Sequence, residues 1–188
     1  MKSVTSQTAL NRLKSGNKRF VADKATHERQ DRERREELEE GQHPFAVILS
    51  CADSRVIPEL VFDTGLGELF VVRVAGNVAN TSSIASIEYA VANLGTKLIV
   101  VLGHESCGAV TAAMGGGDNG YNLNHLLAHI VPAVNGTPGT KTVEKVVKTN
   151  AKMTVKELKN RSPIIDKCKG LKIVGAYYEL GTGKVKFL

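Results

Sequence analysis

The sequence predicts an α/β fold of three layers, in which a mainly parallel central β-sheet is flanked by helices. Continuous apolar runs at residues 45–50, 68–74 and 98–102 are typical of strands that are buried on both faces. Helical patterns separate these runs, as expected where crossover helices join parallel strands. At 188 residues the chain can bury one sizeable core, and we expect a single domain over residues 1–188.

The chain is expected to begin with two helices. The first is predicted over residues 5–23, where one face is apolar and Thr5 or Ser6 can serve as the N-cap. The second, over residues 27–40, is almost wholly charged and has Leu38 as its only large apolar residue. Such a helix is either a solvated surface helix or an arm that needs a partner surface. The domain then divides into an N-terminal helical arm (1–41) and an α/β core (42–188).

Further helices and a final hairpin complete the predicted core. Residues 81–94 place apolar side chains on one stripe, and Gly95 can end that helix. Another helix begins at 107–114 and is followed by a glycine-rich break at 115–120. The remaining predictions are helices over 124–134 and 141–160, a strand over 171–178 and an antiparallel C-terminal edge strand over 184–188.

Composition excludes several classes of partner. The formal charge is +6, but basic residues are scattered or interleaved with acids, and only five Phe and four Tyr are present, so nucleic-acid binding is not indicated. No apolar run approaches the roughly 20 residues that span a bilayer, and residues 1–7 lack the apolar stretch of a secretory signal. The three cysteines, an odd number, argue against a disulfide framework. We therefore expect a cytoplasmic protein without membrane partners.

Cysteine and histidine side chains follow two of the predicted strands. Cys51 comes directly after the first strand, and His104 and Cys107 come after the strand over 98–102. Because ligands gather at the carboxyl ends of parallel strands, the three can converge on one zinc ion. Three protein ligands with an open fourth position are typical of catalytic zinc, whereas structural zinc usually has four. Cys168, which lies between two lysines, is interpreted as an ordinary thiol.

A carboxylate and a guanidinium lie beside the first of these cysteines. Asp53, two residues after Cys51, can project toward the same side and serve as a fourth zinc ligand or accept a hydrogen bond from zinc-bound water. Arg55 can hold this carboxylate through a bidentate pair. An Asp–x–Arg sequence alone is more simply a surface ion pair, but next to Cys51 the catalytic interpretation is favoured.

Four short motifs follow one another along the predicted core: CADSR at 51–55, RVAGN at 73–77, IEYAV at 87–91 and GHESCG at 103–108. Together they resemble the motifs of the β-class carbonic anhydrases, and the resemblance runs over residues 42–110 and weakly on to 174–178. It implies reversible hydration of carbon dioxide to bicarbonate by zinc-bound hydroxide. It also implies a homodimer or a dimer of dimers, in which the N-terminal helices embrace the neighbouring subunit.

The resemblance also assigns the zinc site. It implies one zinc ion per subunit, bound by Cys51, His104 and Cys107, with Asp53 and Arg55 managing the fourth position. The chain has no tryptophan, so the aromatic residue of the bicarbonate-inhibited subgroup is absent. We therefore expect a member of the subgroup whose site is constitutively accessible.

Four further residues match substrate positions of the family. Gln42 matches an amide that orients the substrate, and Gly108 matches a backbone amide near the zinc. Phe70 and Tyr89 match positions that line the small carbon dioxide pocket. By periodicity alone, however, these two aromatic residues fit the interior of a strand and a helix equally well, and Gln42 fits a loop.

Alternative functions stay open at the level of the sequence. Relatives of this fold hydrolyse carbonyl sulfide or carbon disulfide at the same zinc site, and the pocket dimensions that decide between substrates are not readable from the chain. A non-catalytic zinc-stabilised module would need a fourth protein ligand, with Asp53 permanently in that position. A nucleotide-binding fold is disfavoured, because the Gly-x-Gly at 65–67 lacks a third glycine and precedes a strand.

Overall fold

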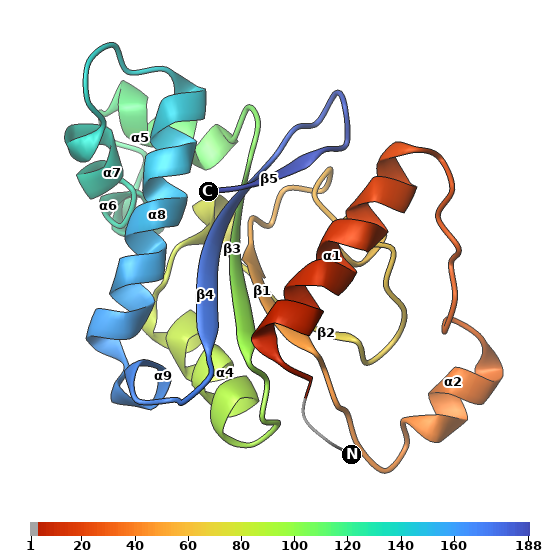
Figure 1. The fold of residues 1–188 in the computed structure, drawn as a ribbon. Coiled ribbons are helices and arrows are strands. Elements are labelled where there is room, and N and C mark those ends of the chain that lie inside the picture. The colour runs from red at the N-terminus through yellow and green to blue at the C-terminus, as the bar shows by residue number, and fades with distance from the viewer. Residues whose placement is uncertain (1–3) are drawn as a thin grey trace.

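The computed structural model describes residues 4–188 and confirms the three-layer α/β fold (Figure 1). Residues 1–3 lie outside the described residues. They are the start of the predicted N-terminal arm and of the segment 1–7, which lacks the apolar stretch of a secretory signal. Within the described part, five strands form one sheet in the order β2-β1-β3-β4-β5, and β5 pairs antiparallel at its edge. The strands are β1 (Ala46–Ser50), β2 (Leu69–Arg73), β3 (Leu98–His104), β4 (Lys172–Tyr178) and β5 (Val185–Phe187).

Helices cover both faces of this sheet (Figure 1). Helices α1 and α3 pack on one face, and α4, α8 and α9 pack on the other. Helices α5, α6 and α7 gather beside α8. The helices are α1 (Ser6–Val21), α2 (Arg32–Glu37), α3 (Pro58–Val61), the 3-10 turn η1 (Ala75–Asn77), α4 (Thr81–Ala92), α5 (Gly108–Gly115), α6 (Tyr121–Ala128), α7 (Val131–Gly136), α8 (Val143–Arg161) and α9 (Pro163–Asp166).

Helix α1 belongs to the core of its own chain. Its N-cap is Thr5, as predicted, and the Thr5 hydroxyl accepts from the backbone N–H of Thr8. Leu10 and Leu13 are buried against the sheet. The buried Asn17 side chain donates to a carbonyl of α3 and to one of the β4–β5 turn. The first part of the predicted arm is therefore fixed to this chain by both packing and hydrogen bonds.

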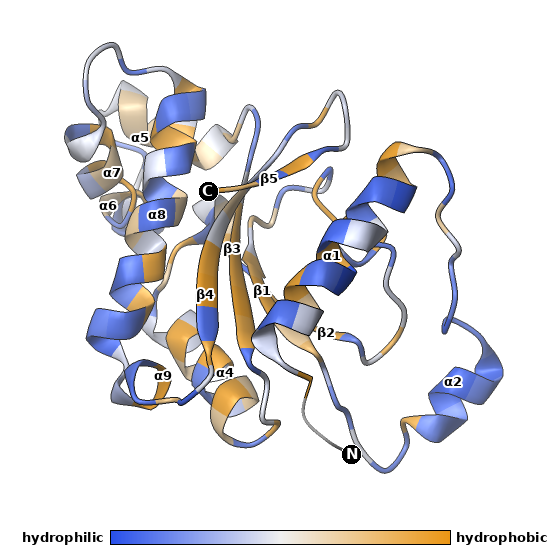
Figure 2. Ribbon diagram, in the orientation of Figure 1, coloured by the Kyte–Doolittle hydropathy of each residue, from blue (hydrophilic) through white to orange (hydrophobic). Residues whose placement is uncertain are grey.

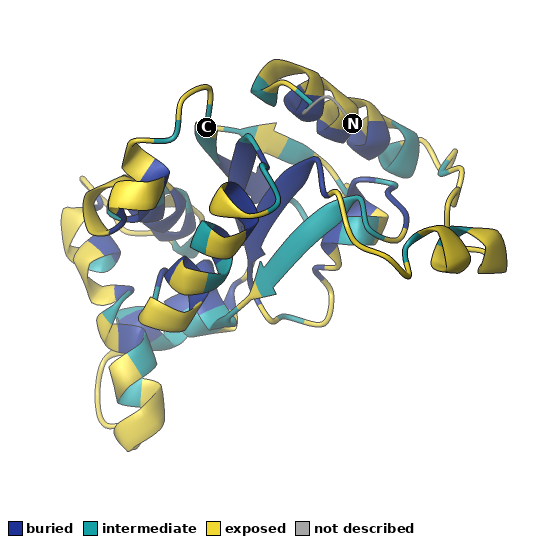
Figure 3. Cartoon of the chain, turned by 90° about the horizontal axis from the view of Figure 1, so that it is seen from below, coloured by how far each residue is buried: buried dark blue, intermediate teal, exposed yellow. Residues whose placement is uncertain are grey.

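The second predicted helix, over residues 27–40, is wrong in its extent, because α2 covers only Arg32–Glu37. His27 and Arg29 have positive φ angles of 52° and 59°, which interrupt a helix. The Asp63 carboxylate holds this bend by accepting from the backbone N–H groups of Thr26 and His27. Helix α2 has no buried residue and is hydrophilic throughout (Figures 2 and 3).

Two other predictions differ in detail from the structure. The single helix expected over 124–134 is two helices, α6 and α7, because Pro132 lacks the N–H that would continue the hydrogen-bonding ladder. Helices α3, η1 and α9 were not predicted, since each has four residues or fewer and shows no periodicity. Strand β3 extends two residues beyond its predicted end and finishes at His104 itself.

Burial is greatest in the middle of the sheet. Strands β1 and β3 are buried along their whole length, and β2, at the sheet edge, is only half-buried (Figure 3). The strands form the apolar centre of the molecule (Figure 2). Among residues 4–188, no helix combines the length and the hydropathy needed to cross a membrane.

Candidate metal centre

Three of the predicted ligands converge at the carboxyl ends of neighbouring strands. Cys51 directly follows β1, His104 ends β3, and Cys107 is the N-cap residue of α5. Strands β1 and β3 are parallel neighbours, with Ser50 paired to Leu102, so their ends meet at one edge of the sheet. The two sulfur atoms and an imidazole nitrogen all lie within 4.8 Å of one another, and all three residues are buried.

The imidazole of His104 is oriented for metal binding. Its side chain is fully buried, and Nδ1 donates to the carbonyl oxygen of Glu105 at 2.9 Å. Because a carbonyl can only accept, Nε2 is left with its lone pair free. Nε2 is buried and makes no hydrogen bond within residues 4–188. Buried polar atoms are rarely unpaired, so this nitrogen fits a metal ligand.

The turn after β3 holds the imidazole in place. The backbone N–H of Glu105 donates to the carbonyl of Tyr178 at 2.8 Å, at the end of β4. The Glu105 carboxylate accepts from the backbone N–H of Leu180 at 2.9 Å. Both contacts tie Glu105, whose carbonyl accepts the hydrogen bond from His104, to the β4–β5 hairpin. The tautomer and orientation of the ring therefore follow from the sheet.

The two cysteines share a buried site that disfavours two negative charges. The neighbouring Cys107 thiol lowers the pKa of Cys51, and burial opposes this effect. The same contact, together with burial, raises the pKa of Cys107 above its ordinary value. A divalent cation would remove this conflict, since both sulfurs could then be thiolates. The donor set of two thiolates and one imidazole fits zinc.

Asp53 and Arg55 form the bidentate pair that the sequence suggested. Nε and Nη2 of Arg55 donate to the two carboxylate oxygens at 2.9 and 2.7 Å, and the backbone N–H of Arg55 donates to Oδ1 at 2.9 Å. These bonds hold the pKa of Asp53 well below its usual range, although burial opposes them. Asp53 Oδ2 lies 3.9 Å from Nε2 of His104. The carboxylate is thus held by Arg55 and stays beside the imidazole.

Arg73 contacts the same segment, although the sequence suggested no chemistry for it. Its Nε donates to the carbonyl of Cys51 at 3.1 Å, and its Nη2 donates to the carbonyl of Asp53 at 2.7 Å. Arg73 therefore fixes the backbone that carries the sulfur and the carboxylate. Carbonyl groups belong to every residue, so no sequence signal reveals such a contact.

The four predicted substrate residues lie in different places. Gly108 follows Cys107 as the first residue of α5 and is exposed, whereas Gln42 is exposed before β1. The rings of Phe70 and Tyr89 are 6.4 Å apart between centroids, on β2 and α4. Phe70 pairs with Val47, which lies four residues before Cys51. Four residues of a strand span roughly 13 Å, so Phe70 is about that far from Cys51 along the sheet. Within one chain, the two aromatic residues lie together but away from the cysteines.

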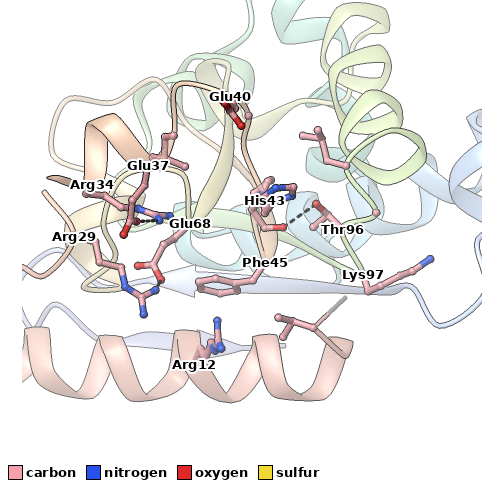
Figure 4. A pocket seen from close by; sticks show the side chains of 16 residues that line it. Arg12, Arg29, Arg34, Glu37, Glu40, His43, Phe45, Glu68, Thr96 and Lys97 are labelled. Atoms are coloured by element: carbon pink, nitrogen blue, oxygen red, sulfur yellow. Dashed lines mark hydrogen bonds and ion pairs between the residues drawn. The ribbon is translucent and has the colours of Figure 1, made fainter. Parts of the chain in front are cut away.

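A cavity of about 1060 Å³ lies at the opposite end of the sheet (Figure 4). Its wall includes residues that directly precede strands, such as Phe45 and Lys97. The Arg29–Glu68 and Arg34–Glu37 ion pairs also line it, and Arg12 of α1 points toward it over the Phe45 ring. None of the predicted site residues lines this cavity, so it is separate from the cysteine–histidine group.

Comparison with known sequences places these residues in a family context. The family profile described as carbonic anhydrase matches residues 46–185. A carbonic anhydrase of Mycolicibacterium smegmatis is 42% identical over 185 residues, which cover 93% of this chain and 89% of that protein. Carbonic anhydrase 2 of Mycobacterium tuberculosis is 42% identical over 181 residues, covering 92% of this chain and 87% of the relative.

Solved structures with a similar fold include β-carbonic anhydrases. One of the tetrameric enzymes of Sordaria macrospora has a TM-score of 0.75 and 27% identity, with 93% of each chain covered. The Coccomyxa enzyme, solved in complex with acetazolamide, has a TM-score of 0.73 and 26% identity, covering 95% of this chain and 84% of that one.

Proposed function

Since this chain belongs to the β-carbonic anhydrase family, we propose that it hydrates carbon dioxide reversibly to bicarbonate at one zinc ion held by Cys51, His104 and Cys107. The observation that carries the proposal is the convergence of two buried sulfurs with the free lone pair of a buried imidazole nitrogen. These three atoms come together at the carboxyl ends of β1 and β3.

The chain's own residues would act on the water next to this group. Zinc, when bound by such ligands, supplies a Lewis acid that lowers the pKa of a coordinated water. The Asp53 carboxylate, kept ionised by Arg55, accepts a hydrogen bond from a water or bicarbonate hydroxyl beside Nε2 and orients it. The Arg55 side chain is 53% exposed, so its charge also attracts bicarbonate from solvent.

Stopped-flow measurement of carbon dioxide hydration tests this function. The zinc-loaded protein is expected to hydrate carbon dioxide, to lose the activity after zinc is removed by a chelator, and to regain it with one zinc ion per chain. Carbonyl sulfide is assayed beside carbon dioxide, and carbon dioxide is expected to be the better substrate. Stoichiometric zinc binding without hydration at alkaline pH would refute the proposal.

We also propose that the protein is a homodimer or a dimer of dimers, joined through β2. This strand is a half-buried apolar edge, and Tyr89 beside it is 51% exposed. Phe70 and Tyr89 are too far along the sheet to reach the cysteines of their own chain. A second copy across this edge would let Gln42, Phe70 and Tyr89 line the site of the partner. The tetrameric Sordaria relatives support an assembly of this kind.

Mixed dimers test whether these residues act across the interface. Chains with Asp53→Ala are mixed with chains that carry both Phe70→Ala and Tyr89→Ala, and the heterodimers are isolated by different tags. If the aromatic residues serve the partner, each heterodimer contains one intact site and recovers hydration activity that neither parent has. If they serve their own chain, both sites are defective, and the heterodimer stays as inactive as its parents.

A cytoplasmic location is part of the same proposal. Cys51, Cys107 and Cys168 are all free thiols in the structure. Free thiols that must stay available to metal are typical of a reducing compartment. Fractionation of cells, with the protein followed by immunoblotting, distinguishes this location from an exported one.

A further inference from the structure

A buried asparagine on α8 is linked to the metal centre through one glycine. The Nδ2 atom of Asn150 donates to the carbonyl of Gly76 at 2.9 Å. The backbone N–H of the same glycine donates to the Cys51 sulfur at 3.3 Å. Both hydrogen bonds are buried, and Asn150 itself is only 3% exposed. The side chain lies 99 positions after the cysteine, so no local sequence pattern joins them.

Gly76, which joins the two hydrogen bonds, lies in a tight turn. Gly76 lies in η1 with a φ of 68° and a ψ of 16°, a left-handed conformation that glycine adopts readily. A Cβ atom at this position would be 2.5 Å from Cδ1 of Ile130. The turn is closed by the Asn77 N–H, which donates to the Val74 carbonyl at 2.8 Å, and a further contact at the Gly76 carbonyl restricts the rotation of the glycine inside this turn. The Asn150 bond to the carbonyl supplies that contact.

Helix α8 is held firmly enough to carry such a constraint. Its residues Val146 and Val147 pack in the same apolar cluster as Cys51 and Cys107. A Cβ atom on Gly103 would be 2.6 Å from Cγ1 of Val147, so α8 approaches β3 closely just before His104. Asn150 lies about one helical turn beyond Val147, so the packing of Val147 against β3 also fixes the position of Asn150.

We propose that Asn150 is a positioning residue, which orients Gly76 so that its N–H donates to the Cys51 thiolate and thereby tunes the bond from this sulfur to the metal. This inference rests on the proposed metal site. A hydrogen bond to a ligating sulfur withdraws electron density from it, and such outer contacts typically change metal affinity or activity by about 10–100-fold.

Cobalt substitution tests the proposal, since thiolate-to-cobalt charge-transfer bands report on the electron density at sulfur. Asn150→Leu removes the donor at nearly constant size. It is expected to shift the band to longer wavelength and to weaken zinc binding about tenfold, measured by competition with a chromophoric chelator. Thr154→Val is the matched control, because it removes another buried polar group of α8, whereas the hydrogen bond from α8 to Gly76 comes from Asn150. The control is expected to keep the wild-type band and affinity.

A measurement on the unmodified sequence covers the case in which Asn150→Leu does not fold. With ¹¹³Cd in the site, the Gly76 amide proton is expected to show scalar coupling to cadmium through the hydrogen bond to sulfur. Absence of this coupling, or a wild-type band in a folded Asn150→Leu variant, would overturn the inference while leaving the proposed function intact. If wild-type protein shows no thiolate band at all, the proposed metal site fails and the inference fails with it.

Discussion

Replacing Asp53 with alanine is expected to lower the rate of carbon dioxide hydration by about 10²–10⁴-fold, the usual contribution of a group that exchanges or orients a proton. Its bonds to Arg55 keep the carboxyl group ionised, and Oδ2 lies 3.9 Å from Nε2 of His104. It is therefore placed to orient a hydroxyl beside this nitrogen. Stopped-flow kinetics of the zinc-loaded variant measure the loss.

Zinc content separates this role from a ligand role. Because the three ligand atoms converge without Asp53, the variant is expected to keep one zinc ion per chain. Asp118→Ala is a suitable control, because Asp118 is another loop carboxylate bonded to a nearby N–H but remote from the group. A loss of zinc in Asp53→Ala, or full activity, would contradict the account.

Replacing Cys51 with serine is expected to weaken zinc binding by about a hundredfold or more and to remove hydration activity. Four-ligand zinc sites bind with roughly 10–16 kcal/mol, so one ligand accounts for about 3 kcal/mol, which is about a hundredfold in affinity. The serine hydroxyl stays protonated near neutral pH and is a poor replacement for a thiolate. Chelator competition measures the affinity, and the activity is assayed at saturating zinc.

The third cysteine provides the control for this change. Cys168 lies at the end of the sheet opposite the metal centre, where its sulfur is 3.1 Å from Nζ of Lys97, the residue just before β3. Cys168→Ser is expected to leave both zinc affinity and hydration unchanged. Equal losses in the two variants would mean that the cysteines stabilise the fold in general and that Cys51 has no special role.

The parts of the fold with strong periodicity could be predicted from the sequence. The apolar runs around Val47 and Val100 became parallel strands that are buried on both faces, as expected for such runs, whereas the run around Val71 became the half-buried edge strand β2. The convergence of Cys51 with His104 and Cys107 followed from strand direction alone. The charged stretch from His27 was misjudged, because contacts of Asp63 with the backbone bend it, and charge patterns do not report such contacts.

The residues that orient the predicted ligands could not be predicted in the same way. Arg73 acts on carbonyl groups, and Asn150 acts through Gly76, so both depend on tertiary contacts between distant segments. The lone pair on His104 Nε2 also depends on one carbonyl in the following turn. Ligand types are visible in a sequence, whereas the groups that orient them appear only when the chain is folded.

Both proposals depend on a zinc ion that is bound by two sulfurs and one imidazole, with its fourth position left open. X-ray absorption at the zinc edge, recorded on the wild-type protein and on Asp53→Ala, tests it most directly. We expect two sulfur atoms at about 2.3 Å and two nitrogen or oxygen atoms at about 2.0–2.1 Å, with the same spectrum for both proteins. A site with fewer than two sulfurs, or one that loses an oxygen ligand in Asp53→Ala, would contradict it.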